Sequence, residues 1–265
     1  MIGGDLRATE GVLPSGARWR AHGRGEPVTL VTHGLGATPG EARIPASGLP
    51  GTRVVLTFAG HGDAADAPDG YWDYGVLAAD VLAAADAVGA TRAVGVSLGT
   101  GALTRAAAEH PARFERLALL LPAVLDGGRE VSSAWALERL AEAVAAAESD
   151  GGAALRERVA AEFPPGAQLG EHLAARTAAL LRLGPALHAL GDRAVLDDAA
   201  VLRAVRSDVL VLTGTDDPLH PVAAARSVAA AIPGARLELL PSVAPLFTHR
   251  KELRALLADF LAATR

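Results

Sequence analysis

Ser97 stands at the centre of a Gly-x-Ser-x-Gly sequence, with Gly95 before it and Gly99 after it. Residues 92–96 form a short, mostly apolar run that predicts a strand, and residues 98–110 have the composition of a helix. A serine on a tight turn between a strand and a helix projects its hydroxyl above the sheet, beside a helix N-terminus that favours negative charge. The pattern therefore predicts a nucleophile elbow with Ser97 as the nucleophile.

A serine hydroxyl becomes a useful nucleophile only when a base lies within hydrogen-bond reach and a third group holds that base. Two adjacent acids, Asp216 and Asp217, follow an apolar run at residues 208–212. Beyond them the chain has only two histidines, His220 and His249. The eight histidines of the whole chain form no His-x-x-x-His pair or carboxylate cluster, so we expect no metal and no cofactor.

The segments around these residues alternate between strand-like and helix-like patterns. Short apolar runs predict strands at residues 28–32, 53–58, 92–96, 117–121, 208–212 and 237–240, and the alternation at residues 17–21 is typical of an edge strand. Helical spacing of apolar residues predicts helices at residues 76–88, 98–110, 222–232 and 250–263. This order predicts an α/β fold with a mostly parallel, doubly wound sheet.

Three further segments, in a fixed order with the elbow, carry a resemblance to a known family. They are His33-Gly34-Leu35-Gly36, Gly60-His61-Gly62 and Gly214-Thr215-Asp216-Asp217-Pro218-Leu219-His220-Pro221, and each follows a predicted strand. With these segments the chain resembles the α/β-hydrolase superfamily, specifically a serine hydrolase with a helical cap. The resemblance covers most of the chain and leaves only its middle unmatched.

The resemblance implies roles for several residues. The backbone N–H groups of Leu35 and Leu98 would form the oxyanion hole. The family's acid usually stands four residues before a proline in the loop after the strand at 208–212. That spacing selects Asp217 over Asp216 as the acid, with Asp126 as a less favoured alternative after the strand at 117–121.

The base is harder to assign, because family members carry a histidine just after the last strand. Here residues 243–245 occupy that place and contain no histidine, whereas His249 follows slightly later, at the start of the closing helix. We therefore assign the base to His249 and expect His220 to contribute only local packing. His61 is interpreted as a packed loop histidine, since no second metal ligand is spaced near it.

The middle of the chain predicts helices without strands, at residues 133–148, 153–162, 169–183 and 199–205. Its position matches the helical cap of the superfamily, which divides the chain into a core of residues 1–122 and 207–265 and a cap of residues 123–206. Because caps usually wall off the substrate pocket, the candidate pocket residues are the larger apolar ones of this region: Trp135, Leu137, Phe163, Leu180 and Leu187.

Composition limits the classes of partner. The 265 residues are 50% hydrophobic with a net charge of -5 and interspersed acids and bases, which favours a globular protein and argues against nucleic acid as the main partner. The chain has no cysteine, which excludes disulfides, thiolate metal sites and a cysteine nucleophile. We see no signal peptide and no membrane-spanning stretch, so we expect a cytoplasmic protein with a small-molecule substrate; the oligomeric state stays open.

Two functions remain open from the sequence. The first is a serine hydrolase that cleaves a small, largely apolar ester, thioester or amide through an acyl-enzyme. The second is a protein of the same fold that does not hydrolyse, such as a lyase- or cyclase-type relative or a ligand-binding protein. The missing histidine at residues 243–245 favours the second function, whereas the intact elbow and the Asp217 loop favour the first.

Overall fold

A twisted sheet of eight strands runs through the described residues, which in this computed structural model are 8–125, 131–163, 166–191 and 193–262. Its order is β1-β2-β4-β3-β5-β6-β7-β8, and every pairing from β4 to β8 is parallel. The strands are β1 (Glu10–Val12), β2 (Arg18–His22), β3 (Val28–Thr32), β4 (Thr52–Thr57), β5 (Arg92–Val96), β6 (Arg116–Leu120), β7 (Asp208–Gly214) and β8 (Arg236–Leu240). The predicted mostly parallel, doubly wound sheet is confirmed.

The central strands are buried on both faces, which explains why they are continuous apolar runs. Every residue of β3, β5 and β6 is buried, as expected for parallel strands covered by helices on both sides. One strand prediction was wrong: β2 is not an edge strand. The short strand β1 pairs with it in antiparallel fashion and covers its outer side, while β4 pairs with its inner side.

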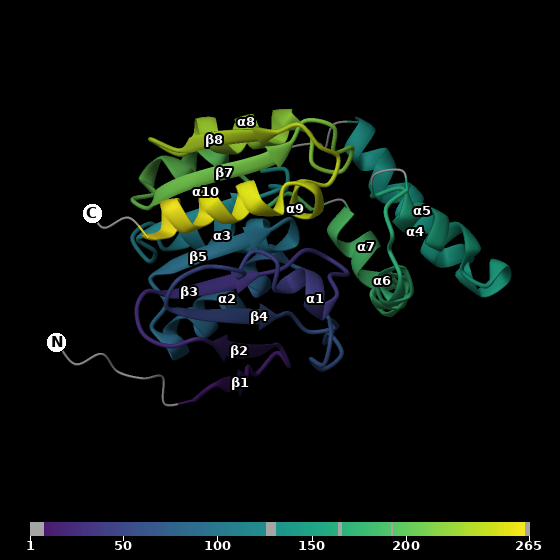
Figure 1. The fold of residues 1–265 in the computed structure, drawn as a ribbon, viewed down its shortest axis with the longest axis horizontal. Coiled ribbons are helices and arrows are strands. Elements are labelled where there is room, and N and C mark those ends of the chain that lie inside the picture. The colour runs from purple at the N-terminus through teal and green to yellow at the C-terminus, as the bar shows by residue number, and fades with distance from the viewer. Residues whose placement is uncertain (1–7, 126–130, 164–165, 192, 263–265) are drawn as a thin grey trace.

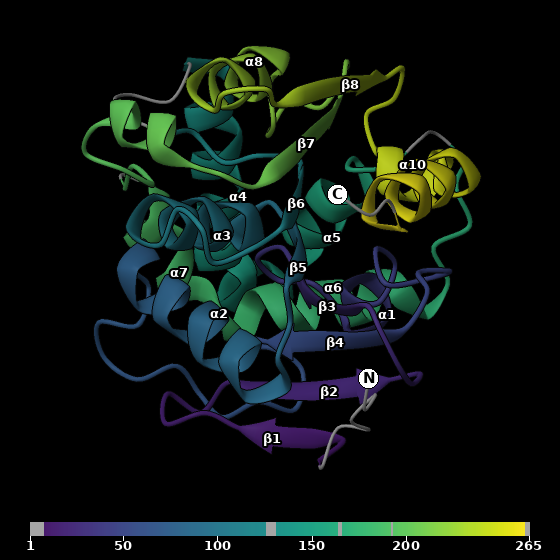
Figure 2. The same ribbon diagram turned by 90° about the vertical axis from the view of Figure 1, so that its left-hand side faces the viewer.

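Helices cover the sheet on both faces (Figure 2). One hydrophobic cluster lies on one face of the sheet, where it is covered by helices α2 (Tyr74–Val88), α3 (Leu98–Glu109) and α8 (Val222–Ala231). The short α1 (Pro39–Ala42) and α9 (Pro245–Thr248) and the longer α10 (Arg250–Ala262) contribute to a second cluster on the other face. Helix α2 has well-formed ends, with the Asp73 side chain accepting from the Gly75 N–H and Gly89 in the left-handed conformation.

In the described residues between β6 and β7, four helices stand to one side of the sheet, beyond the carboxyl ends of the parallel strands (Figure 1). They are α4 (Val131–Asp150), α5 (Ala153–Ala160), α6 (Glu171–Arg182) and α7 (Gly184–Gly191), followed by the 3₁₀ helix η1 (Ala199–Ala204). The sequence Gly184-Pro185 begins α7 directly after α6 ends. A proline fits the first turn of a helix because the N–H it lacks would have no partner within the helix.

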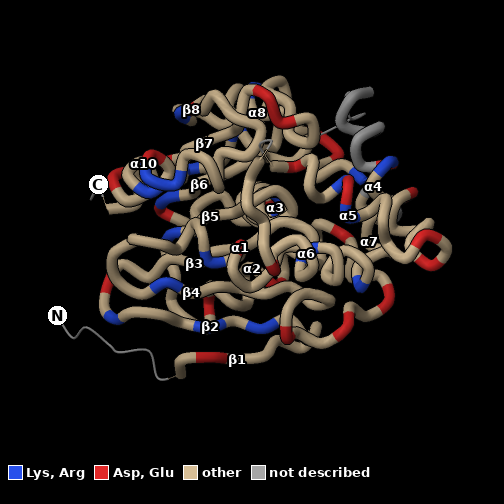
Figure 3. The backbone as a smooth tube through the Cα atoms, turned by 45° about the vertical axis from the view of Figure 1, so that its right-hand side comes forward, with Lys and Arg blue, Asp and Glu red and all other residues tan. Residues whose placement is uncertain are grey.

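Charged residues are spread along the whole described chain. Figure 3 shows acidic and basic residues interspersed over the backbone, as the sequence predicted. Within the described ranges, none of the helices has the length and apolar character that a bilayer crossing requires.

Close packing of backbones at the elbow depends on two glycines. A Cβ on Gly95 would lie 2.7 Å from the carbonyl oxygen of Gly99, and a Cβ on Gly99 would lie 2.3 Å from Thr32 Oγ1 and 2.9 Å from the Thr32 carbonyl carbon. All three separations are too short for real atoms, so helix α3 can approach strands β5 and β3 only because both positions lack a side chain.

We expect Gly99→Ala to destabilise the fold, because its new methyl group meets the backbone of Thr32. Overpacking of this kind costs ~1–3 kcal/mol in the free energy of unfolding. Urea unfolding measures this change. Gly40→Ala is the matched control, since a Cβ there has only Thr38 Oγ1 near it, at 3.8 Å. Equal unfolding midpoints for the two variants would contradict the packing explanation.

Candidate active site

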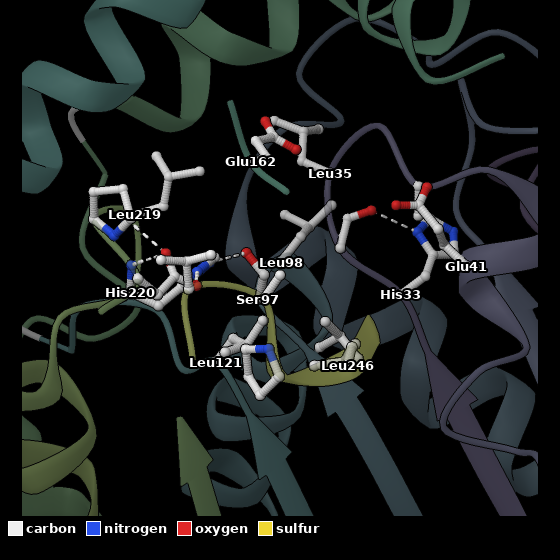
Figure 4. A pocket seen from close by; sticks show the side chains of 18 of the residues that line it. His33, Leu35, Glu41, Ser97, Leu98, Leu121, Glu162, Leu219, His220 and Leu246 are labelled. Atoms are coloured by element: carbon white, nitrogen blue, oxygen red, sulfur yellow. Dashed lines mark hydrogen bonds and ion pairs between the residues drawn. The ribbon is translucent and has the colours of Figure 1, made fainter. Parts of the chain in front are cut away.

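Ser97 lies on the sharp turn between β5 and α3. Its backbone has φ 49° and ψ -108°, an unusual conformation for a residue with a side chain. The Ser97 N–H donates to the Leu120 carbonyl at 3.0 Å, and the Ser97 carbonyl accepts from Thr100 and Gly101. The predicted elbow is therefore present, and the hydroxyl of Ser97 faces a cavity (Figure 4).

A histidine lies beside that hydroxyl, and it is His220. Its Nε2 is 2.8 Å from Ser97 Oγ, and its Nδ1 is 2.8 Å from Asp217 Oδ2 (Figure 4). A carboxylate can only accept, so Nδ1 carries the proton and Nε2 is left to accept from the Ser97 hydroxyl. The three side chains thus form one continuous chain of hydrogen bonds. The side chain of His220 is 15% exposed and that of Asp217 is 8% exposed.

Asp217 and His220 belong to the same tight turn after β7. The Oδ1 atom of Asp217 accepts the backbone N–H of Leu219 at 2.8 Å and that of His220 at 3.2 Å, and Pro218 follows the aspartate, as is common in turns. Burial alone would raise the pKa of Asp217, but the charge of His220 and the hydrogen bonds from its ring and from the two backbone N–H groups outweigh burial and hold the pKa below its ordinary value. The carboxylate is therefore ionised at neutral pH.

The structure contradicts the prediction that His249 lies beside Ser97. His249 is the last residue before α10, and its Nδ1 is 2.8 Å from the hydroxyl of the exposed Thr248. The place beside Ser97 Oγ is filled by His220, which we had expected to contribute packing only. Asp216 is exposed and accepts from the Thr215 hydroxyl, and the alternative acid Asp126 lies outside the described residues.

The signal that was missed is the spacing Asp-x-x-His between Asp217 and His220. A turn folds residues three apart onto each other, and an aspartate that caps its own turn holds the two side chains together. Residues 243–245 contain no histidine, and the prediction placed the base further along the chain, at His249, although His220 lies only three residues from the predicted acid. Val243, Ala244 and Pro245 now form part of the apolar cavity wall.

The loop after β3 passes directly over the elbow. A Cβ on Gly34 would lie 3.4 Å from Ser97 Cβ, and the His33 carbonyl accepts the Gly99 N–H at 3.1 Å. Two buried histidines hold this loop in place through hydrogen bonds to its backbone. His33 Nε2 accepts the Phe58 N–H, so its Nδ1 donates to the Gly34 carbonyl at 2.9 Å.

His61 serves the same loop in the same way. Its Nε2 accepts the Gly36 N–H at 2.9 Å, so its Nδ1 donates to the Ala59 carbonyl. Both rings must be neutral to accept through Nε2, and burial makes them so: it lowers the pKa of His33 to about 4 and that of His61 well below its ordinary value. His61 is thus a packed loop histidine, as the sequence indicated.

The two predicted oxyanion residues, Leu35 and Leu98, both line the cavity beside Ser97 (Figure 4). Leu35 belongs to the loop that crosses the elbow, and Leu98 is the first residue of α3. Among the described residues, no group accepts the backbone N–H of either leucine. These two N–H groups are therefore available to a ligand in the cavity.

The cavity has a volume of about 360 Å³ and is lined mainly by apolar side chains. Of the predicted pocket residues, Phe163 and Leu180 line it, whereas Leu187 is buried in the hydrophobic cluster of the neighbouring helices and does not belong to the described lining. The side chains of Trp135 and Leu137 lie outside the described residues. The charged residues of the lining come from several elements: Glu41, Arg158, Glu162, Arg176, Asp216 and Asp217.

Among the described residues, no three histidine, aspartate or glutamate side chains gather in a group that could hold a metal ion. His33 and His61, whose ring centroids are 4.5 Å apart, use both ring nitrogens in hydrogen bonds to the backbone.

Solved structures of similar shape are enzymes of one fold. An enol-lactonase from Burkholderia xenovorans LB400 aligns with a TM-score of 0.73 and 24% identity over 94% of this chain and 98% of that one. A hydrolase from Pseudomonas aeruginosa PA01 gives 0.71 and 26% over 93% and 94%, and an esterase from Exiguobacterium antarcticum gives 0.77 and 18% over 99% and 100%. No protein-family model and no curated protein sequence matches the chain. The α/β-hydrolase fold, which the sequence resemblance predicted, is confirmed.

The buried histidines predict that acidification from neutral pH destabilises the fold. Burial places the pKa of His33 at about 4 in the native state against an ordinary value of 6.5, so between these values the unfolded chain binds a proton that the native chain does not. The stability that depends on the neutral His33 ring is fully present above pH 6.5. As the pH falls toward 4, the free energy of unfolding falls by up to ~1.4 kcal/mol per pH unit for one such group. Urea unfolding between neutral pH and about pH 4.5 measures it.

His33→Asn should show a shallower loss of stability with falling pH than the unaltered protein, because the titrating ring is gone. His61 adds a loss of the same sign. Asp217 does not contribute in this window, since the stability from its lowered pKa is lost only below its ordinary value of 3.8. An unfolding free energy that stays constant from pH 6.5 to about pH 4.5 would contradict this assignment.

Proposed function

We propose that this protein of α/β-hydrolase fold is a serine hydrolase in which Ser97 is the nucleophile, His220 the base and Asp217 the acid. The observation that carries the proposal is the position of His220, whose two ring nitrogens lie 2.8 Å from Ser97 Oγ and from Asp217 Oδ2. This is the arrangement that activates a serine hydroxyl: a base in contact with it and an ionised acid that fixes the tautomer of the base.

The proposed reaction follows from these contacts. As Ser97 Oγ attacks the carbonyl carbon of the substrate, its proton moves to His220 Nε2, and the carbonyl oxygen becomes an oxyanion. Asp217 stabilises the imidazolium that forms. The imidazolium then gives its proton to the leaving group, which departs and leaves an acyl-enzyme on Ser97. His220 then deprotonates a water molecule, which attacks the acyl-enzyme, releases the acyl group as a carboxylic acid and restores the Ser97 hydroxyl.

The proposed oxyanion hole is formed by the backbone N–H groups of Leu35 and Leu98. Both residues line the cavity beside Ser97, and both N–H groups lack an acceptor within the described chain. Each such donor typically lowers the barrier by ~3 kcal/mol, because it meets charge that exists only in the transition state.

The cavity supports a small and largely apolar substrate. Its volume of about 360 Å³ is at the small end of ligand pockets, and the walls beside Ser97 include Leu121, Leu219 and Leu246 (Figure 4). An ester, thioester or amide with a short acyl group fits this space. The names of the similar structures, which include esterases and an enol-lactonase, agree with ester chemistry. Helices α4 to α7 would act as the cap that closes the cavity, with residues 123–206 as the proposed cap domain.

The competing function is a protein of this fold that does not hydrolyse. It was favoured by the lack of a histidine at residues 243–245, which removed the expected base. Because His220 supplies a base from the loop after β7, that reason no longer applies. Hydrolysis is therefore the better supported function.

Ser97→Ala and His220→Ala should each lower kcat for a short-chain p-nitrophenyl ester by at least ~10³-fold, because the members of a triad act as one unit and their losses do not add. Steady-state kinetics measures the effect, and circular dichroism checks that the variants are folded. His249→Ala is the matched control and should keep kcat within about twofold of the unaltered protein, because the His249 ring contacts Thr248 and not Ser97. The reverse order, with His249 essential and His220 dispensable, would refute the proposed base.

Asp217→Asn should lower kcat by ~10³- to 10⁴-fold, because an amide no longer holds His220 in the tautomer that accepts from Ser97. Asp216→Asn is the control for an acid in the same loop, because the exposed Asp216 side chain accepts from the Thr215 hydroxyl, whereas the His220 ring contacts Asp217. It should change kcat by no more than about twofold. Comparable losses in both variants would indicate a general effect of loop charge and not a positioned acid.

A further inference from the structure

We propose that Arg176, on helix α6 of the cap, is a positioning residue for the oxyanion loop, which comprises residues 33–38 between β3 and α1. Arg176 holds this loop through the carbonyl oxygen of Leu35. This inference rests on the proposed function, since the loop matters only if Leu35 donates to an oxyanion. It assigns a new role in that reaction to a residue far from Ser97 in the sequence.

The two peptide groups that flank Leu35 carry four polar atoms, and three of them have partners. The Gly34 carbonyl accepts from His33 Nδ1 at 2.9 Å, and the Gly36 N–H donates to His61 Nε2 at 2.9 Å. The Leu35 carbonyl accepts from Arg176 Nη1 at 2.9 Å. The fourth atom is the Leu35 N–H, the proposed oxyanion donor.

The contact from Arg176 differs in kind from the other two. His33 and His61 belong to the loops after β3 and β4 and hold the oxyanion loop from the side of the sheet, whereas Arg176 reaches it from the cap. The Leu35 N–H lies in the peptide plane between Gly34 and Leu35, which the hydrogen bond from His33 holds. This plane is joined through the Leu35 Cα to the next one, between Leu35 and Gly36, which Arg176 and His61 hold. A cap that moved away would remove the contact from Arg176 and leave only His61 on the second plane.

Acidic side chains hold the guanidinium in place. Arg176 Nη2 donates to Glu162 Oε2 at 3.4 Å, and Nη1 lies 3.9 Å from Glu41 Oε2. Glu41 also accepts the Thr38 N–H at 2.7 Å in the capping box of α1, which continues the same loop. The Arg176 side chain is only 13% exposed, so its geometry is well constrained.

Helix α6 also packs directly on the loop. Arg176 and Leu180 are four residues apart and therefore share one face of the helix. A Cβ on Gly36 would lie 2.6 Å from Leu180 Cδ2 and 3.2 Å from Arg176 Nη1. With φ +69° at Gly36, the glycine permits both the turn of the loop and the close approach of α6.

The consequence is that one specific contact of the docked cap, from Arg176 to the Leu35 carbonyl, contributes to the oxyanion hole. When α6 is docked, the Leu35 N–H is held toward the cavity beside Ser97. The hydrogen bond to the Leu35 carbonyl matters most when charge develops on the substrate oxygen, so its loss should affect the transition state more than substrate binding.

The test compares two arginines of the same helix. Arg176→Met should lower kcat and kcat/KM for a p-nitrophenyl ester together, by about tenfold to hundredfold, with little change in KM. Arg176→Lys should recover part of the loss, because an ammonium keeps a charge and a donor but cannot bind Leu35 and Glu162 as the planar guanidinium does. Affinity for an alkyl boronic acid, which forms a tetrahedral adduct on serine, should fall in parallel with kcat.

Arg182→Met is the matched control for docking of the cap. Arg182 also ties α6 to the core, through Asp66 and the carbonyls of Gly62 and Ala64, but it does not contact the oxyanion loop. It should change KM or thermal stability and leave kcat within about twofold. Equal effects of the Arg176 and Arg182 substitutions on kcat would reduce the role of Arg176 to docking and overturn the proposal.

The outcomes separate this proposal from the proposed function. Turnover by the unaltered protein with an unchanged kcat in Arg176→Met overturns the role of Arg176 and leaves the hydrolase intact. An absence of turnover in the unaltered protein overturns both. If Arg176→Met fails to fold, Arg176→Lys decides the matter: a several-fold fall in kcat at constant KM supports the positioning role, and an unaltered kcat overturns it.

Discussion

The carboxylate of Asp217 is the point on which the proposed site depends. One oxygen accepts the backbone N–H groups of Leu219 and His220 and so shapes the turn after β7, while the other accepts from the His220 ring. The same group therefore determines where the histidine lies and which nitrogen carries its proton. Because the turn follows β7, two strands from the end of β5, His220 reaches Ser97 across the carboxyl end of the sheet.

Much of this arrangement could be predicted because it depends on local rules. Apolar runs defined the central strands, since parallel strands buried on both faces have no polar side to show. Ser97 was found from its glycines, which a tight contact between α3, β5 and β3 requires. Asp217 was selected by its distance from Pro221, and it lies beside the histidine that contacts Ser97.

The base could not be predicted in the same way, because its assignment rested on where the resemblance puts a histidine and not on the geometry of the turn. The spacing of Asp217 and His220 contained the local information about the base. The resemblance, however, places a histidine after the last strand, and this led to the prediction of His249. The contact of Arg176 with Leu35 has no local signal at all. It joins residues 141 apart through the packing of α6 on the loop, and only the three-dimensional structure reveals it.

The central claim, that His220 activates Ser97, is tested most directly by covalent labelling with a fluorophosphonate, which reacts with activated serines. Peptide mass spectrometry after labelling should find the adduct on Ser97 in the unaltered protein and in His249→Ala, and should find labelling slowed by orders of magnitude in His220→Ala. Labelling of Ser97 at an undiminished rate in His220→Ala, or no labelling of the folded, unaltered protein, would contradict the account.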